Sequence, residues 1–324
     1  MITEATTNRR NPFNVAGKAV TATSAQDAAR QANLDWHVQL ADLQAKAISN
    51  DGVSLLDVPS TFATVRTNND GNQSVLGTVG SRYKVLQNGE MFSALDALVE
   101  SGEARYASAG ELKGGAKVWM MLALPKEVKI EGDPHAAYLL ARTSHDGSCS
   151  LGITPVINRI WCANQISGIF RRGTKYELKH TTNAKLSVSD IRQMLNVIYT
   201  GIDDYESIAS HLLSKKIDDR DAVDIFKKMW SVPSIIEDTP YSLLSTGQRR
   251  VYNTATQARQ TANNIYLGST GTQDHLKGTA FGAFQAIVEY ADHFSHKTES
   301  VRAERTVSGT ADKLKSKALA LLTK

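Results

Sequence analysis

The chain has little cysteine and no long apolar run, and each absence excludes a class of protein. Two of its 324 residues are cysteines, Cys149 and Cys162, and their spacing fits neither a metal site nor a disulfide framework. No apolar run approaches the roughly 20 residues of a membrane-spanning helix, and the segment MITEATTNRRNP has no hydrophobic signal core. We therefore expect a soluble protein of a reducing cytoplasm, with no membrane partner.

Sequence motifs for nucleotide hydrolysis and for covalent catalysis are absent as well. Residues 110–117 (GELKGGAK) contain the glycines and lysines of a phosphate-binding loop but lack its Gly-Lys-Ser/Thr ending, so we interpret them as a hairpin turn. The chain has no dinucleotide fingerprint and no nucleophile elbow. We therefore expect no cofactor, no catalytic residue and no enzymatic activity.

Two small groups of residues could bind a metal ion and thus provide an enzymatic alternative. His145-Asp146 would suit a metal-dependent nuclease, although a turn also favours Asp, which hydrogen-bonds the backbone, and Gly, which adopts a positive φ. Asp292, His293 and His296 lie within one turn of an expected helix, but the further ligands of a metal site are missing, which favours a solvated helix face. We expect no metal site.

The composition is that of a folded protein with a small positive charge. Hydrophobic residues make up 41% and charged residues 22% of the chain, which is ordinary for a globular protein. Lys and Arg number 37 against 33 Asp and Glu, which gives a formal net charge of +4. This balance is compatible with nucleic-acid binding and is too small to indicate it alone.

Changes in residue pattern divide the chain into three regions. Residues 1–23 are polar and poor in aromatics, and we expect them to form a flexible N-terminal arm. Residues 24–185 mix short helical segments with strand patterns, whereas residues 186–324 have helical periodicity. We expect an α+β fold: an antiparallel β-meander with flanking helices, followed by a mostly helical C-terminal region.

Cap residues predict two helices in the core. Ser24, with Asp27 three residues later, predicts a helix from 25 to 32. Asn88 is a good N-cap, and Glu90 in the following turn complements the helix dipole. The second helix is expected to end at Ser101-Gly102.

Strand patterns joined by tight turns fill the rest of the core. They lie at 34–40, 62–66, 74–79, 105–109, 117–124, 136–143 and 149–153. The turn at 68–72 (NNDGN) is a strong hairpin signal, and the last four strands follow one another as an antiparallel meander. For residues 153–170, helix and irregular backbone both remain open.

Helical periodicity dominates from Ser187 onward. One apolar stripe predicts a long first helix, and it consists of Met194, Ile198, Ile202, Tyr205, Ile208 and Leu212. Further helices are expected at 219–230, 248–263, 279–296 and 314–322. The connections at 231–247 and 267–278 have the composition of mobile loops.

Three segments together resemble a known family. They are the stretch from Leu76 to Leu124, the turn SHDGS at 144–148 and the segment TPVINRIWCANQ at 154–165. They resemble the phage/plasmid-like proteins grouped as domain of unknown function 932. The resemblance implies a mobile-element origin in a bacterial host and implies no activity. More remotely, a helix, a curved meander and a second helix resemble the core of single-strand annealing recombinases.

Basic and aromatic residues gather in a few segments and predict a track for single-stranded nucleic acid. Basic side chains contact phosphates, and aromatic planes stack on unpaired bases. The residues that we predict to bind nucleic acid are Arg82, Tyr83, Lys84, Lys113, Lys117, Arg159, Arg171, Arg172, Lys175 and Lys179. The alternative is that these side chains form solvated rims.

We expect a phage or mobile-element protein that binds single-stranded DNA and promotes annealing without ATP, in recombination or replication. A homo-oligomer, as a ring or filament, would lengthen the binding groove, and a phage or host replication or recombination protein would be a further partner. The alternative is a structural or regulatory interaction protein of a mobile element that makes no direct DNA contact.

Overall fold

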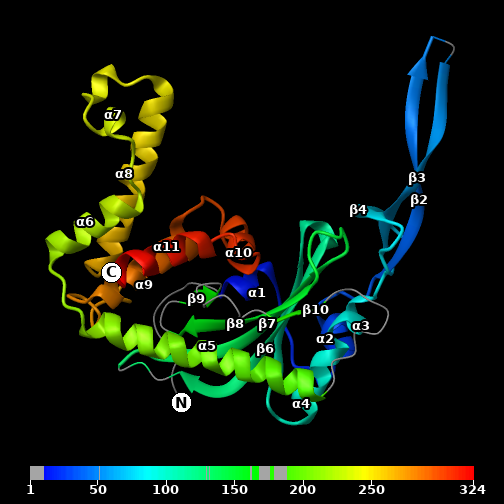
Figure 1. Cartoon of the computed structure of the whole chain (residues 1–324), viewed down its shortest axis with the longest axis horizontal. Helices are drawn as coiled ribbons and strands as arrows, with labels where there is room; N and C mark the ends of the chain where they lie inside the picture. Colours follow the sequence, from blue (N-terminus) through cyan, green and yellow to red (C-terminus); the bar gives the residue numbers. More distant parts are fainter. Residues whose placement is uncertain are drawn as a thin grey trace.

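The computed structural model (Figure 1) describes residues 11–50, 52–128, 130, 132–160, 163–167, 176–178 and 188–324. For residues 127, 167, 176–178 and 188–191 it describes the backbone alone. Two antiparallel sheets occupy the first part and helices the last part, so the predicted α+β class is confirmed. Among the described helices, none has the length and apolarity that crossing a bilayer requires.

The larger sheet has the strand order β1-β5-β6-β7-β8-β10, and β9 also pairs with β8. Its strands are β1 (Gly17–Ala19), β5 (Arg105–Leu112), β6 (Lys117–Val128), β7 (His135–Ser144), β8 (Leu151–Arg159), β9 (Asn164–Ser167) and β10 (Tyr176–Leu178). Strands β5 to β8 are the predicted meander, and each pairs antiparallel with the next. For residues 153–170 we weighed helix against irregular backbone, and both are wrong for residues 153–159 and 164–167, which lie in the paired strands β8 and β9.

The smaller sheet consists of β2 (His37–Ser49), β3 (Gly52–Thr67) and β4 (Gln73–Gly80) in that order. The predicted hairpin turn at 68–72 joins β3 to β4. Strand β4 pairs with residues 61–67 of β3, whereas β2 pairs with β3 as far as Gly52. Residues 44–57 therefore form a two-stranded ribbon, the β-arm, which projects from the molecule (Figure 1).

Helices flank the two sheets and follow them in the chain. They are α1 (Pro12–Ala16), α2 (Ala25–Gln31), α3 (Asn88–Phe92), α4 (Asp96–Glu100), α5 (Val188–Ser214), α6 (Asp219–Met229), α7 (Ser234–Glu237), α8 (Thr246–Tyr266), α9 (Ala280–Glu289), α10 (Glu299–Val307) and α11 (Asp312–Leu322). The expected helix at 279–296 leaves α-helical geometry after Glu289, where a π-helical turn spans Tyr290–Phe294.

Alternating side chains of β6 belong to two cores on opposite faces of the larger sheet. Val118, Met120 and Leu122 are buried in the larger core, which also includes side chains of α2, α5 and α9. Trp119 and Met121 are buried in a smaller core that α1 and α10 complete. The sheet is therefore covered on both faces, which explains why its strands carry so few polar side chains.

The N-terminal segment is folded from Pro12 onward, and the prediction of a flexible arm over 1–23 is wrong for residues 12–20. Strand β1 pairs with β5, and Phe13 is fully buried with its ring 5.3 Å from that of Trp119. A Cβ added at Gly110 would lie 2.7 Å from the Trp119 ring, so the indole needs a glycine there. The apolar residues of this polar segment cover Trp119. Residues 1–10 lie outside the described residues.

The predicted N-cap residue is correct for α2, and for α3 it is wrong by one residue. The Ser24 side chain accepts a hydrogen bond from the Asp27 amide, as predicted. The N-cap of α3 is Gln87, which forms a capping box with Glu90. Asn88, predicted to be the cap, is buried inside the helix and donates from Nδ2 to the Leu34 carbonyl at 2.7 Å.

The C-terminal helices assemble around α9, whose residues are all buried. The predicted apolar stripe of α5 is confirmed, because its side chains from Met194 to Leu212 contribute to the larger core. In Figure 1, α5 runs along one side of the sheet, while α6, α7 and α8 extend away from it at the end opposite the β-arm. A helical half is thus built onto the meander, as expected.

Truncating Phe13 tests whether the N-terminal segment belongs to the fold. The Phe13→Ala change should lower the free energy of unfolding by about 3–5 kcal/mol, because it opens a cavity beside Trp119. Urea denaturation measures this as a lower midpoint with an unchanged slope. Asn14→Ala, at an exposed position of the same helix, should shift the midpoint little. Equal midpoints for both variants would mean that the segment does not pack as described.

Candidate nucleic-acid interface

The two sheets meet at the turn between β5 and β6. Arg66 of β3 donates from Nη1 to both carboxylate oxygens of Glu111, at 2.9 and 2.8 Å. Its guanidinium also lies 4.4 Å from the Trp36 ring centroid, and the Trp36 Nε1 donates to Glu111 at 3.1 Å. Gly115 has a positive φ of 96°, and a Cβ there would lie 2.9 Å from the Arg66 Nη1. One ion pair and one close backbone approach therefore fix the small sheet to the large one.

This junction also brings together five of the residues predicted to bind nucleic acid. The Tyr83 hydroxyl donates to the Ser144 carbonyl at 3.2 Å, and Lys117 is the strand partner of Ser144. Lys113 begins the turn that leads to Lys117. Arg82, Lys84 and Lys113 are exposed, and Lys117 is half-buried. Segments that are far apart in sequence thus place basic side chains at one end of the larger sheet.

Acidic neighbours limit the positive charge of this surface. The Lys117 charge contributes to lowering the pKa of Asp146, although hydrogen bonds with Ser148 contribute more and burial opposes both. Burial, with a smaller effect of the Asp146 charge, raises the pKa of Tyr83 to about 12. The Tyr83 hydroxyl therefore stays protonated and acts as a hydrogen-bond donor.

Four predicted binding residues, Arg171, Arg172, Lys175 and Lys179, lie outside the described residues.

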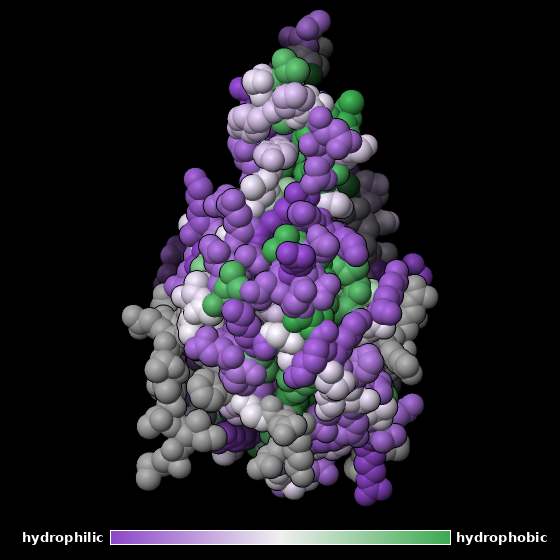
Figure 2. All heavy atoms as spheres, turned by 90° about the vertical axis from the view of Figure 1, so that its left-hand side faces the viewer, coloured by the Kyte–Doolittle hydropathy of each residue, from purple (hydrophilic) through white to green (hydrophobic). Residues whose placement is uncertain are grey.

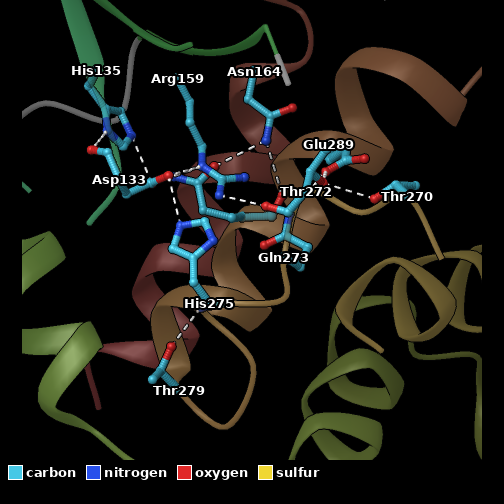
Figure 3. Close-up of polar contacts among 12 residues, drawn as sticks. Asp133, His135, Arg159, Asn164, Thr270, Thr272, Gln273, His275, Thr279 and Glu289 are labelled. Atoms are coloured by element: carbon cyan, nitrogen blue, oxygen red, sulfur yellow. Dashed lines mark hydrogen bonds and ion pairs between the residues drawn. The ribbon is translucent and has the colours of Figure 1, made fainter. Parts of the chain in front are cut away.

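Arg159 is placed differently from the other predicted residues. Its side chain is fully buried, and its Nε donates to both oxygens of Asp133, at 2.7 and 2.8 Å. Its Nη2 donates to the Thr272 carbonyl at 2.7 Å. Arg159 pairs with His135 across β7 and β8, at the opposite end of β7 from Ser144. The residue belongs to an internal cluster (Figure 3) and not to the surface at the sheet junction.

Two histidines complete the surroundings of Asp133 (Figure 3). The His275 Nε2 lies 3.3 Å from one carboxylate oxygen, and the His135 Nε2 lies 3.6 Å from the other. Burial alone would raise the pKa of Asp133, but the His275 hydrogen bond and the Arg159 charge outweigh it and hold the pKa below its usual value. Burial lowers the pKa of His135, so its imidazole is neutral at pH 7.

The same cluster fastens the connection before α9, for which we expected a mobile loop. The Thr272 hydroxyl and the Gln273 amide both donate to the buried Glu289 carboxylate, at 2.7 and 2.9 Å. Because Arg159 holds the Thr272 carbonyl, the connection is tied to β8 and to α9 at once. The irregular backbone of this connection was predicted correctly. Its hydrogen bonds to Arg159 and Glu289 could not be predicted, because neighbouring residues in the sequence do not indicate them.

Asp292 lies in a second buried ion pair, so the prediction of a solvated helix face is wrong for this residue. Its carboxylate is 2.6 Å from the Lys315 Nζ, and both side chains are fully buried. It also accepts from the Gln165 amide and from the Thr306 hydroxyl, each at 2.8 Å. Lys315 donates further to the Gln165 carbonyl. Asp292 can be buried here because Lys315 of α11 supplies the compensating charge.

His145 and Asp146 point to different surroundings. His145 is fully buried, with its Nε2 2.8 Å from the Asn88 Oδ1 and its ring 5.3 Å from that of Trp36. Asp146 instead accepts a hydrogen bond from the Ser148 backbone amide at 2.9 Å, which forms an Asx turn. This is the structural role that we considered as the alternative to a nuclease site. In the described residues, no group of three or more His, Cys, Asp and Glu side chains is arranged to hold a metal.

Comparisons with known proteins give a family and no activity. Residues 75–318, about three quarters of the chain, match the family model described as Domain of unknown function (DUF932). No curated protein and no solved structure matches the chain. The remote resemblance to single-strand annealing recombinases therefore gains no support.

The Asp133–Arg159 pair predicts a characteristic pattern of stabilities. Asp133→Asn or Arg159→Met alone should lower the free energy of unfolding by about 3–5 kcal/mol, because each leaves one buried charge unpaired. The double variant should be less destabilised than the sum of the two, since it leaves no lone charge. Urea denaturation of all four proteins measures this coupling.

An exposed ion pair serves as the control. Asp224→Asn removes a partner of Lys227 on α6, where both side chains are more than half exposed, and should cost under about 1 kcal/mol. Additive effects of the Asp133 and Arg159 changes would contradict the described pairing.

Proposed function

The chain belongs to the family described as Domain of unknown function (DUF932), and for this member we propose binding of single-stranded DNA and ATP-independent annealing of complementary strands. The setting would be recombination or replication of a phage or another mobile element in a bacterial cytoplasm. The observation that carries the proposal is the shared position of residues 82–84 and 113–117 at one end of the larger sheet.

The proposed surface is narrower than the one expected from sequence. It consists of the exposed side chains of Arg82, Lys84 and Lys113 with the half-buried Tyr83 and Lys117. Arg159 is left out, because Asp133 neutralises its charge in the interior. Arg171, Arg172, Lys175 and Lys179 remain proposed contacts on the sequence alone.

Annealing requires no catalytic side chain under this proposal. The basic residues reduce the repulsion between two phosphate backbones and hold one strand with its bases accessible. Base pairing then supplies the free energy of the reaction. Phosphate contacts carry no sequence information, so binding would be independent of base sequence.

Charge reversal at the exposed positions tests the proposed function. In the variant Arg82→Glu, Lys84→Glu, Lys113→Glu, binding of a single-stranded oligonucleotide should weaken at least tenfold, and annealing should slow in parallel. The logarithm of the binding constant decreases with the logarithm of the salt concentration, and this negative slope should become shallower by about 0.7 for each lost phosphate contact. Fluorescence anisotropy at several salt concentrations, with chelator and without ATP, measures both effects.

A matched control changes the same net charge elsewhere. Arg220, Lys228 and Arg250 are exposed on α6 and α8, and their triple change to Glu should leave the affinity nearly unchanged. Equal weakening in both triple variants would mean that the protein binds DNA through net charge alone. An absence of binding by the parent protein at low salt would refute the proposed function.

A second candidate function is that of a structural or regulatory interaction protein without DNA contact, and the β-arm favours it. One face of the arm carries Ile48, Val53 and Leu55, which are 78%, 61% and 64% exposed. They lie on one face because Ile48 pairs with Val53, and Leu55 follows two residues later. An isolated two-stranded ribbon is marginally stable in water, so this apolar face is expected to be covered.

We propose a second copy of the chain as the occupant of this face. The far end of the molecule also exposes apolar side chains, Ile235 at 67% and Leu243 at 74%. Figure 2 views that side and shows separate hydrophobic groups within a mostly hydrophilic surface. Helix α8 at this end carries three arginines and no acid, whereas the described part of the β-arm has one lysine and one aspartate and is therefore neutral. Contact between the two ends would thus bring no set of like charges together. Contact between opposite ends would produce a ring or filament.

Substitutions on the two faces of the β-arm test this oligomer. The variant Ile48→Ser, Val53→Ser, Leu55→Ser should become monomeric by light scattering after size-exclusion chromatography, at concentrations where the parent protein is oligomeric. Ala45→Ser with Ala47→Ser, on the opposite face, should preserve the oligomer. A parent protein that is monomeric at tens of micromolar would contradict the proposal.

A further inference from the structure

A cavity of about 180 Å³ lies on the face of the larger sheet that α1 and α10 partly cover. It is lined by β6, β7 and the start of β8, with Ser308 directly after α10. Two cations, Lys117 and Arg142, line it, and its lining contains no carboxylate. The charged groups in the lining are therefore cations alone, and the cavity lies beside the proposed DNA surface, with which it shares Lys117.

Strand register places the two cations on the same side of the sheet. Arg142 pairs with Trp119 across β6 and β7, and Lys117 precedes Trp119 by two residues. The side chains of these three residues therefore project from one face. The Arg142 Nη1 donates to the Val307 carbonyl at 2.9 Å, which holds the guanidinium at the edge of α10. A Cβ at Gly309 would lie 3.0 Å from the same nitrogen.

Several hydrogen-bonding groups of the lining residues have no partner among the described residues. A guanidinium has five N–H donors, and within the described residues one of those of Arg142 has a hydrogen-bond partner. The Lys117 side chain makes no hydrogen bond or ion pair to any described residue. The Trp119 Nε1 is buried without an acceptor in the part of the chain that the structure describes. Cys149 and Ser150 add a thiol and a hydroxyl.

Two carboxylates lie outside the lining and act on the cations from behind. The Asp312 charge favours the charged form of Arg142, against the effect of burial, which lowers the arginine pKa. The Lys117 charge in turn contributes to the lowered pKa of Asp146. Neither carboxylate belongs to the lining of the cavity.

We propose that this cavity binds a phosphate group. Its volume is below the roughly 300–1,000 Å³ of sites for drug-sized ligands, and it suits a small oxyanion with several acceptor oxygens. Arginine and lysine side chains are the usual partners of such a group. Two sources supply this chemistry, free phosphate and the terminal phosphate of a DNA strand. The second source rests on the proposed DNA-binding function.

Calorimetric titration of the full-length protein with inorganic phosphate tests the site. The parent protein should bind phosphate saturably at constant ionic strength. Arg142→Gln and Lys117→Met should each weaken binding at least tenfold. Lys117→Met is the decisive variant, because it removes no hydrogen bond or ion pair between described residues, whereas Arg142 also holds α10. Arg105→Met removes an exposed cation from the same sheet outside the cavity and should leave phosphate binding unchanged.

Single-stranded oligonucleotides with a 5′-phosphate, a 3′-phosphate or neither identify the source. At least tenfold tighter binding of one phosphorylated end, lost in Lys117→Met, supports the strand terminus. Phosphate binding without an end preference supports free phosphate. Failure to bind inorganic phosphate and any phosphorylated end overturns the site, even if DNA binds through the exposed residues. Phosphate binding without DNA binding leaves the site intact and refutes the proposed function.

Discussion

Charges buried inside a protein have to be matched inside it, and this constraint determines how the sheet and the helices of this molecule are joined. Arg159 ends a strand of the sheet, and Asp133 precedes the neighbouring strand. The guanidinium extends the pair to the helical half through the Thr272 carbonyl. Lys315 does the same from the other direction, because it comes from the last helix and meets Asp292 and the Gln165 carbonyl.

Each pair is neutral as a unit and lies within one half, Asp133 with Arg159 in the sheet region and Asp292 with Lys315 in the C-terminal helices. The other half supplies the remaining hydrogen bonds: the Thr272 carbonyl accepts from Arg159, and the Gln165 backbone donates to Asp292 and accepts from Lys315. The two halves are held in one arrangement because separating them would leave these buried charged groups short of hydrogen-bond partners.

Sequence reasoning succeeded where the signal is local. Short β-type runs separated by turn residues predicted the strands of the meander, and Ser24 with Asp27 predicted the start of a helix, because both depend on neighbours a few residues away. It failed at Arg159, which sits among apolar residues and whose burial depends on Asp133 and on a loop more than 100 residues later. The β-arm was missed for a related reason, since neither of its faces is covered by the chain itself.

Two populations of basic residues in the described part of the chain thus differ in their surroundings. Arg66, Arg159 and Lys315 have carboxylate partners and stabilise contacts between elements. Arg82, Lys84 and Lys113 remain exposed at the sheet junction. A count of positive charges cannot separate the two populations, because the partners are distant in sequence. The small net charge of the chain therefore understates how unevenly the accessible positive charge is distributed.

Helices α1 and α10, which are far apart in the sequence, lie against each other, since Phe13 and Val307 belong to the same small core. Trp119 and Met121, which occupy the middle of that core, are synthesised long before Val307. During translation, this face of the sheet therefore stays open to solvent until α10 has left the ribosome. Contacts of such high sequence separation slow folding and prolong the exposure of apolar surface. Completion of this small core therefore depends on α10, which is synthesised long after the sheet.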